Sequence, residues 1–202
     1  PDVALGPPDR EADPEDLPYP AWGQRVPDVS LPAPLSERTV AFREVDQPFL
    51  VTFIYTHCMS VCPILQSGLR EVQIHSAQNG YAADVSFYPV TFDPERDTAD
   101  ALRAEAEKLN VDLSAGNWHY LRPAGRDRAK AVVEDEFGVT FKRTKTDDGE
   151  PGYMFTHLGL VVLVNGDGYV ERAYRPAYED GGKEIRFDET RVISDVETVR
   201  EA

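Results

Sequence analysis

The chain has two cysteines, Cys58 and Cys62, which stand four residues apart in the segment CMSVCP. Positions i and i+4 share one face of a helix, so both thiols can point at one ion or approach each other. The partial positive charge at a helix N-terminus favours thiolate over thiol, and thiolates bind soft metals and attack disulfides. The pair therefore indicates a metal site or a redox site, and the alternative is two ordinary buried cysteines.

Two cysteines do not complete a metal site, and the chain offers four histidines as further ligands. His57 adjoins Cys58, but in an extended strand its side chain faces the opposite way. We expect His75 at the surface of a helix and His119 in packing. His157 precedes an apolar stretch and approaches the cysteines if that stretch lies beside the first buried strand. Spacing alone leaves His157 as either a ligand or a structural histidine, and favours the structural role.

Several regular elements must position these residues. The apolar run Phe49–Tyr55 predicts a buried central strand, and Leu65, Leu69 and Val72 predict one face of the helix that follows the cysteines. Pro89 lacks a backbone donor and indicates an edge strand or a bulge. The other expected elements are strands at 40–42, 85–92 and 118–121, helices at about 98–109, 127–137 and 188–200, and a hairpin of 158–164 and 169–174 around the turn Asn165–Gly168.

This order predicts an α/β fold with a mixed central sheet flanked by helices, an extra N-terminal segment and a β-hairpin. Cysteines at the junction of the first strong strand with a helix are typical of the thioredoxin-like fold. Residues 1–34 hold nine of the 16 prolines and many acidic residues, so we expect a tether there and the thioredoxin-like domain at 35–202. The part from Trp22 to Leu35 carries apolar residues and is expected to lie along the domain. The segment 144–154 is polar, and we expect it to form a mobile loop.

The charge is strongly negative, with 36 acidic and 21 basic residues and a net charge of −15. This balance argues against nucleic acid as a partner, because a phosphate backbone would be repelled. Arg predominates over Lys among the basic residues, and this, together with the acidity, favours a protein from a high-salt organism. At high salt the repulsion between surface carboxylates is screened, so a dense negative surface destabilises the fold little. No apolar run of about 18 residues or signal peptide is present in the chain.

Three segments together resemble the SCO/SenC family of thioredoxin-like copper proteins, which help to assemble the binuclear copper centre of cytochrome c oxidase. They are FIYTHCMSVCP at 53–63, VTFDPERDT at 90–98 and FTH at 155–157. The resemblance implies a copper site made by Cys58, Cys62 and His157, which suits Cu(I) and can also hold Cu(II). Asp93 matches an acidic position near that site in the family, where it would support the ligands. The alternative is that Asp93 only shapes the turn before the next helix. Thr156 and Leu158 stand where many members have Asp and Ser, which leaves the tuning of His157 open.

The residues support three functions. The first is a copper metallochaperone, which passes copper to an oxidase subunit by ligand exchange. The alternative is a thiol–disulfide oxidoreductase, which keeps the copper-ligand cysteines of the target reduced through a mixed disulfide, so that enzyme activity is left open. A peroxidase is the weakest, because no PxxxT/SxxC arrangement precedes Cys58.

The resemblance also implies partners and a location. The expected partner is the copper-bearing subunit of cytochrome c oxidase. Family members face the outside of the cytoplasmic membrane or the mitochondrial intermembrane space. We therefore expect an extracytoplasmic protein held at the outer face of the cell membrane by an anchor upstream of Pro1. A monomer is expected, since dense surface charge disfavours self-association.

Overall fold

The computed structural model describes residues 3–7, 21–145, 152–157 and 159–202. The strands are β1 Ser30–Ala33, β2 Arg38–Ala41, β3 Phe49–Ile54, β4 Ser86–Thr91, β5 Phe141–Lys145, β6 Tyr153–His157, β7 Val161–Val164, β8 Val170–Tyr174, β9 Ala177–Glu179 and β10 Glu184–Arg186. The helices are α1 Val61–Gln78, α2 Ala99–Lys108, α3 Arg126–Lys130 with a π-helical continuation Ala131–Glu136, and α4 Glu189–Arg200.

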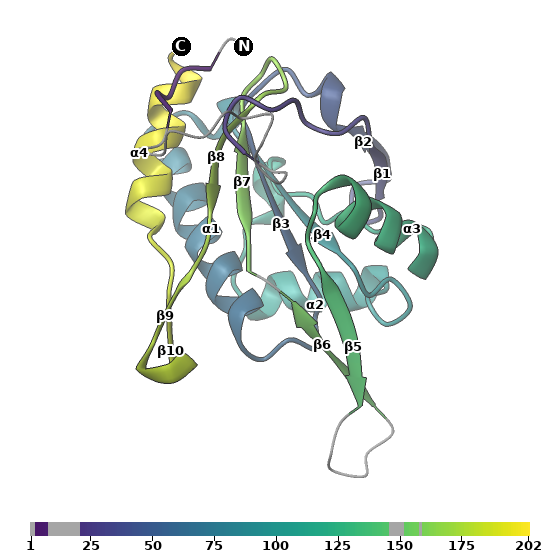
Figure 1. Ribbon diagram of the computed structural model, residues 1–202. Coiled ribbons are helices and arrows are strands. Elements are labelled where there is room, and N and C mark those ends of the chain that lie inside the picture. Colours follow the sequence, from purple (N-terminus) through teal and green to yellow (C-terminus); the bar gives the residue numbers. More distant parts are fainter. Residues whose placement is uncertain (1–2, 8–20, 146–151, 158) are drawn as a thin grey trace.

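The central sheet has the strand order β4-β3-β7-β8. Strand β3 is parallel to β4 and antiparallel to β7, and β7 forms the expected antiparallel hairpin with β8. Helices α1 and α4 contact each other on one side of the sheet, and α3 lies on the other (Figure 1). The expected fold class, a thioredoxin-like α/β fold with a mixed central sheet flanked by helices, is confirmed.

Strand β3 is buried along its whole length because it has a strand on each side and layers on both faces. On one face, the Phe53 ring packs 5.1 Å from the ring of Phe137, which follows the π-helical segment. The hydroxyl of Thr52 donates a hydrogen bond to the carbonyl of Leu160, which satisfies this buried polar group. The turn that carries Cys58 therefore directly follows a strand that is fixed in the core.

Pro89 lies on β4, at the edge of the four-stranded sheet, as its missing N–H predicts. Two positions away on either side, the N–H groups of Phe87 and Thr91 donate to the carbonyls of Asn117 and Leu121. The segment 118–121, which the sequence predicted as a strand, therefore covers this edge through isolated bridges without forming a named strand.

The expected helices form, with ends close to those predicted. Leu65, Leu69 and Val72 are buried on α1. Thr98 caps α2, since its side chain accepts a hydrogen bond from the N–H of Ala101. On the described residues, no helix is both long and apolar enough to cross a lipid bilayer.

The sequence did not anticipate the hairpin of β5 with β6 or that of β9 with β10. Strands β5 and β6 pair antiparallel outside the central sheet, with Phe141 opposite His157. The expected loop at 144–154 is corrected at its ends, because β5 continues to Lys145 and β6 begins at Tyr153; residues 146–151 lie outside the described residues. The other hairpin pairs β9 with β10, and the two hairpins extend from the same end of the molecule (Figure 1).

Part of the N-terminal segment packs on the domain. Strand β1 pairs antiparallel with β2, placing Leu31 opposite Val40. Closer to the N-terminus, the N–H of Leu5 donates to the carboxylate of Glu171, which is buried. Residues 8–20, the middle of the expected tether, lie outside the described residues.

Candidate metal centre

Cys58, Cys62 and His157 meet at one point although 95 residues separate the second cysteine from the histidine. The His157 Nε2 atom lies 3.3 Å from the Cys62 sulfur and 3.9 Å from the Cys58 sulfur. The three ligand atoms all lie within 4.8 Å of one another, and both cysteines are free thiols. The cysteines are buried, with exposed fractions of 2% and 0%, and the histidine is half-buried.

Three different elements bring these atoms together. Cys58 lies in the turn after β3, where its N–H donates to the carbonyl of Tyr55. Cys62 lies in the first turn of α1. His157 ends β6, and the chain then enters β7, whose Val161 pairs with Thr52 of β3. This pairing of the strand after His157 with the buried central strand is the condition under which the sequence placed the histidine near the cysteines.

The two thiols are chemically unequal. A hydrogen bond from the Cys62 thiol lowers the pKa of Cys58 well below its usual value, and the His157 imidazole lowers it further. Burial raises the pKa of Cys62, and the neighbouring Cys58 sulfur raises it too. Cys58 is therefore the thiolate of the pair at neutral pH and Cys62 the thiol that donates to it.

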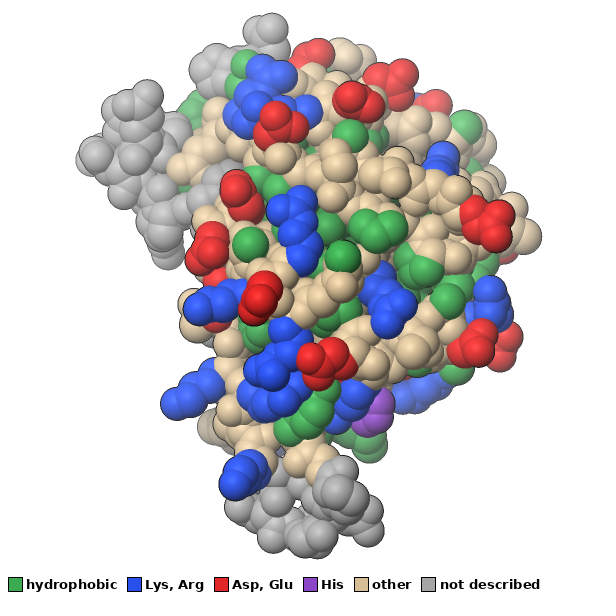
Figure 2. Space-filling model, turned by 90° about the vertical axis from the view of Figure 1, so that its right-hand side faces the viewer, with side chains coloured by type: hydrophobic (Ala, Val, Ile, Leu, Met, Phe, Trp, Pro, Cys, Tyr) green, Lys and Arg blue, Asp and Glu red, His purple; other side chains and the backbone are tan. Residues whose placement is uncertain are grey.

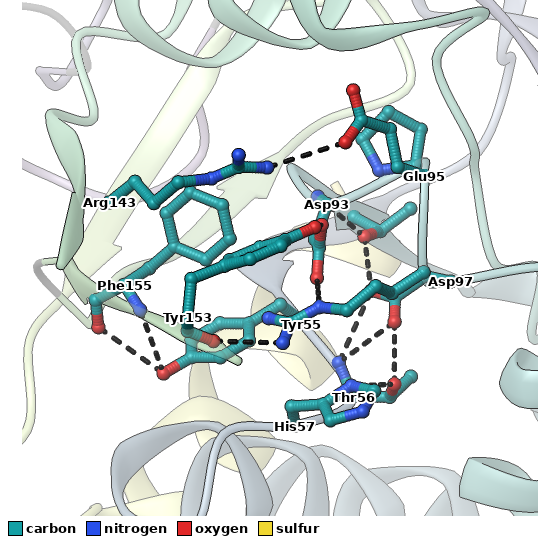
Figure 3. Close-up of polar contacts among 12 residues, drawn as sticks. Tyr55, Thr56, His57, Asp93, Glu95, Asp97, Arg143, Tyr153 and Phe155 are labelled. Atoms are coloured by element: carbon teal, nitrogen blue, oxygen red, sulfur yellow. Dashed lines mark hydrogen bonds and ion pairs between the residues drawn. The ribbon is translucent and has the colours of Figure 1, made fainter. Parts of the chain in front are cut away.

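Aromatic rings orient the histidine. The His157 ring packs 5.0 Å from the ring of Phe92 and 5.7 Å from the ring of Tyr55. The Tyr55 hydroxyl donates to the carbonyl of Phe155 and accepts from its N–H, so the side chain that follows β3 holds the backbone of β6 (Figure 3). Burial raises the pKa of Tyr55 to about 12, which keeps this hydroxyl protonated as a donor.

Asp93 holds the strand that carries His157. Its carboxylate accepts from Arg96 Nε at 2.6 Å and from the Tyr153 hydroxyl at 2.9 Å. The Tyr153 ring lies between two guanidinium groups, those of Arg96 and Arg143, at 3.7 and 3.5 Å (Figure 3). Asp93 thus stabilises the position of β6, the strand that ends at His157.

Asp97 links two strand ends beside the candidate metal centre. Its buried carboxylate accepts hydrogen bonds from the N–H and hydroxyl of Thr56 and from the hydroxyl of Thr91. Burial raises its pKa. The residue therefore joins the C-terminal ends of β3 and β4 immediately before Cys58, a role that the local sequence pattern did not reveal.

The other three histidines are not part of the group formed by Cys58, Cys62 and His157. His57 is exposed and has ligand atoms within 4.8 Å of those of Asp93 and Asp97, but both carboxylates are engaged in the hydrogen bonds described above. His75 bonds to the Tyr81 hydroxyl at 2.7 Å through Nδ1. His119 is buried against the ring of Tyr88, as expected for a packing residue.

Two sulfurs and one imidazole nitrogen within 4.8 Å form a donor set suited to a soft ion such as Cu(I), and the imidazole also suits Cu(II). The three donors come from a turn, a helix and a strand that packing fixes independently. The same two sulfurs are close enough to exchange with a disulfide. The arrangement can therefore bind a soft metal or take part in thiol chemistry.

Comparisons with known proteins agree with this reading. The family model described as SCO1/SenC matches residues 39–186. A SCO1 protein homolog of Bacillus subtilis is 26% identical over 151 residues, which are 74% of this chain and 69% of the relative. Copper-bound ScoI of Bradyrhizobium japonicum superposes with a TM-score of 0.65 at 23% identity, covering 89% of this chain and 99% of ScoI. BsSco, a member of the Sco family of cytochrome c oxidase assembly proteins in which a disulfide switch was identified, gives a TM-score of 0.64 at 22% identity over 89% of this chain and 95% of BsSco.

Proposed function

The chain belongs to the SCO1/SenC family, and from this premise we propose that it is a copper metallochaperone for the binuclear copper centre of cytochrome c oxidase. Copper is its cargo. The observation that carries the proposal is the position of His157 Nε2, which lies within 3.9 Å of both sulfurs. A site for thiol chemistry alone does not need an imidazole there.

Each residue has a distinct role in this proposal. Cys58, already a thiolate, takes the ion first, and Cys62 binds once it releases its proton. His157 supplies the nitrogen that lets the site hold Cu(II) as well as Cu(I). Asp93 acts through Tyr153 by keeping β6 in place, so its support of the ligands is indirect. A recipient protein takes the ion by offering its own ligands to the half-buried histidine side.

A copper titration of the fully reduced protein tests this function. We expect one equivalent of copper to bind, with a thiolate-to-copper absorption band that is lost in Cys58→Ser and in Cys62→Ser. His157→Ala should weaken binding by at least about 10- to 100-fold, because removal of a direct ligand costs no less than removal of a group that supports one. His75→Ala, a histidine outside the site, is the matched control and should bind as the parent does. Unchanged copper binding in both cysteine variants would overturn the proposal.

A second candidate, a thiol–disulfide oxidoreductase, is favoured by one observation: Cys58 is a thiolate beside a second thiol. In this reaction the Cys58 thiolate attacks the target disulfide, forms a mixed disulfide with one target sulfur and releases the other as a thiolate, which takes up the proton of Cys62. The Cys62 sulfur then attacks Cys58, which releases the reduced target and leaves Cys58 and Cys62 as a disulfide. His157→Ala separates the two functions, because a reductant needs the Cys58 thiolate, whose pKa the Cys62 thiol lowers more than His157 does, but not a metal-binding imidazole. Intact oxidase maturation in that variant would favour the reductase.

We place the protein outside the cytoplasm, held at the outer face of the cell membrane, because the family that it resembles works there. Its proposed partner is the copper-bearing subunit of the oxidase. Fractionation of cells that produce the full-length gene product tests the location, and we expect the protein with the membranes and accessible to protease added outside intact spheroplasts. Recovery only from the cytoplasm would contradict it.

A further inference from the structure

Positive charge is concentrated in one part of this acidic chain. Residues 122–145 hold seven of the 21 cationic residues and four acidic ones, giving +3 in a chain whose net charge is −15. We name as the basic patch five of the six cationic side chains of α3 and β5, namely Arg126, Arg128, Lys130, Lys142 and Arg143. Four of these residues are exposed, and Arg143 is half-buried. Figure 2 faces this side of the molecule and shows blue side chains gathered on its lower half.

The basic patch surrounds a hollow with an aromatic lining. The hollow has a volume of about 500 Å³, and the rings of Phe92, Phe141 and Phe155 line it together with most of the patch. Phe92 and Phe141 stack at 4.8 Å, and on another side Phe92 packs against the His157 ring at 5.0 Å. One aromatic ring therefore separates this hollow from a residue of the candidate metal centre.

The patch is incompletely neutralised by the protein itself. Glu95 pairs with Arg143 at 3.3 Å and with Arg126 at 3.8 Å, and Lys130 approaches Glu134 at 4.0 Å. Among the described residues, Lys142 has no ion-pair partner within 4.0 Å. A carboxylate from another molecule can therefore pair here without first breaking an internal ion pair.

We propose that the basic patch is the docking surface for an acidic segment of the protein that receives copper from the candidate metal centre, a proposal that rests on the function above. The remainder of the chain repels an acidic partner, so attraction is confined to this face, and the partner is oriented as it arrives. Carboxylates of the partner pair with the rim, and an apolar side chain covers the aromatic lining. The partner's own metal ligands then lie beside β6 and His157.

An anionic membrane surface is the competing occupant. Two features favour a protein segment. Acidic side chains such as Asp127 and Glu134 stand among the cations and line the same hollow, which suits a pattern of discrete contacts better than a uniform sheet of negative headgroups. The lining is a concave aromatic surface, and aromatic side chains together with Arg are enriched at protein–protein interfaces.

The test compares two double variants with equal charge change. In K130E/K142E both reversals lie on the basic patch, and in the control R103E/K183E both lie elsewhere, on α2 and between β9 and β10. Binding is measured to the copper-free, reduced soluble domain of the oxidase's copper-bearing subunit from the same organism, and separately to vesicles of phosphatidylglycerol. Copper binding by each variant is measured alongside.

We expect K130E/K142E to raise the Kd for the domain by about tenfold or more, and R103E/K183E by less than about twofold, because charge pairs in contact contribute more than net charge. Copper affinity should be equal in all three proteins. Equal weakening by both variants, or none by either, overturns the docking surface. Loss of vesicle binding with unchanged domain binding also overturns it, in favour of a membrane surface. A parent protein that binds the domain through the patch but binds no copper refutes the metallochaperone and leaves the docking surface standing.

Discussion

At the scale of single residues, the chemistry of the site comes from an inequality between two thiols of the same type. Cys58 and Cys62 are both buried, yet the hydrogen bond between their sulfurs stabilises negative charge on one of them. Deep burial makes a second negative charge costly, so the Cys62 thiol keeps its proton. Such a pair binds a soft cation with the release of one proton, because one thiolate is already present.

This inequality predicts the pH dependence of thiolate formation. The pKa of Cys58 is lowered, so its thiolate persists as the pH falls below neutrality, while the raised pKa of Cys62 delays the second thiolate into the alkaline range. Thiolate absorbance at 240 nm in the reduced protein should therefore show one thiolate per chain at pH 6 and two well-separated steps, which belong to the coupled pair.

The variant Cys62→Ala provides the matched comparison. It removes the hydrogen bond that lowers the pKa of Cys58, so the single remaining step should move to higher pH. A parent protein whose two thiols both ionise near pH 8.5, the value of an ordinary thiol, would contradict the assignment.

At the scale of elements, the candidate site depends on a strand that does not belong to the central sheet. Strand β6 pairs only with β5 among the described strands, and side-chain contacts tie it to the rest of the fold. The Tyr55 hydroxyl and the Asp93–Tyr153 bond are two of these contacts. His157 is thus placed by hydrogen bonds and ring packing, whereas Cys62 is placed by a long helix.

Tyr55→Phe should loosen β6 and leave the rest of the fold unchanged. The variant keeps the ring but removes the hydroxyl that bonds both to the N–H and to the carbonyl of Phe155. We expect the amide of Phe155 to exchange about fivefold faster, since one hydrogen bond contributes about 1 kcal/mol. The amide of Val162 in β7 serves as the internal reference in the same hydrogen-exchange experiment. Equal acceleration at both amides would mean a global effect.

Gly159→Ala should strain the contact between the segment before β7 and the start of α1. A Cβ atom there would lie 2.7 Å from Cγ2 of Val61 and 2.9 Å from Cγ of Pro176. We expect the free energy of unfolding to fall by about 1–3 kcal/mol, the usual cost of overpacking. The control is Gly125→Ala, where a Cβ would meet no atom within 4 Å. Denaturant unfolding of both variants tests the prediction, and equal stabilities would refute it.

At the scale of the whole molecule, the dominant property is a net charge of −15. Most of the ion pairs of the described residues lie at the surface, where each contributes little. Self-repulsion therefore opposes the folded state in dilute buffer, and salt relieves it. The basic patch is the local exception to this charge. It surrounds a hollow lined by Phe92, whose ring packs against His157 of the candidate site.

The charge predicts a stability that increases with salt. The melting temperature should rise between about 0.1 M and 2 M KCl, because the Debye length shrinks from about 10 Å to below about 3 Å and screens the repulsion between carboxylates. Differential scanning fluorimetry in KCl measures it, and sucrose of equal osmolality is the control for general solvent exclusion. A melting temperature that stays constant across the KCl series would argue against a high-salt adaptation.

The sequence determined the elements whose signal is local. The run Phe49–Tyr55, the apolar spacing of Leu65 and Leu69, and the turn at Asn165–Gly168 predicted a buried strand, a helix and a hairpin that the structure contains. The cysteine spacing likewise placed the chemistry at the end of β3. Such signals are readable because strand and helix periodicity and turn chemistry depend on neighbours in the chain.

Only the tertiary structure decided what joins these elements at the site. The sequence did not predict the hairpin of β5 and β6, because its largely exposed strands lack a clear alternation of apolar and polar residues. The bonds of Asp97 to Thr56 and of Asp93 to Tyr153 connect residues 41 and 60 positions apart, and no local pattern reports such pairings. His157 was left open between ligand and structural residue for the same reason. Its distance from the cysteines depends on the packing of β6 against Tyr55 and Phe92, which is fixed only when the core closes.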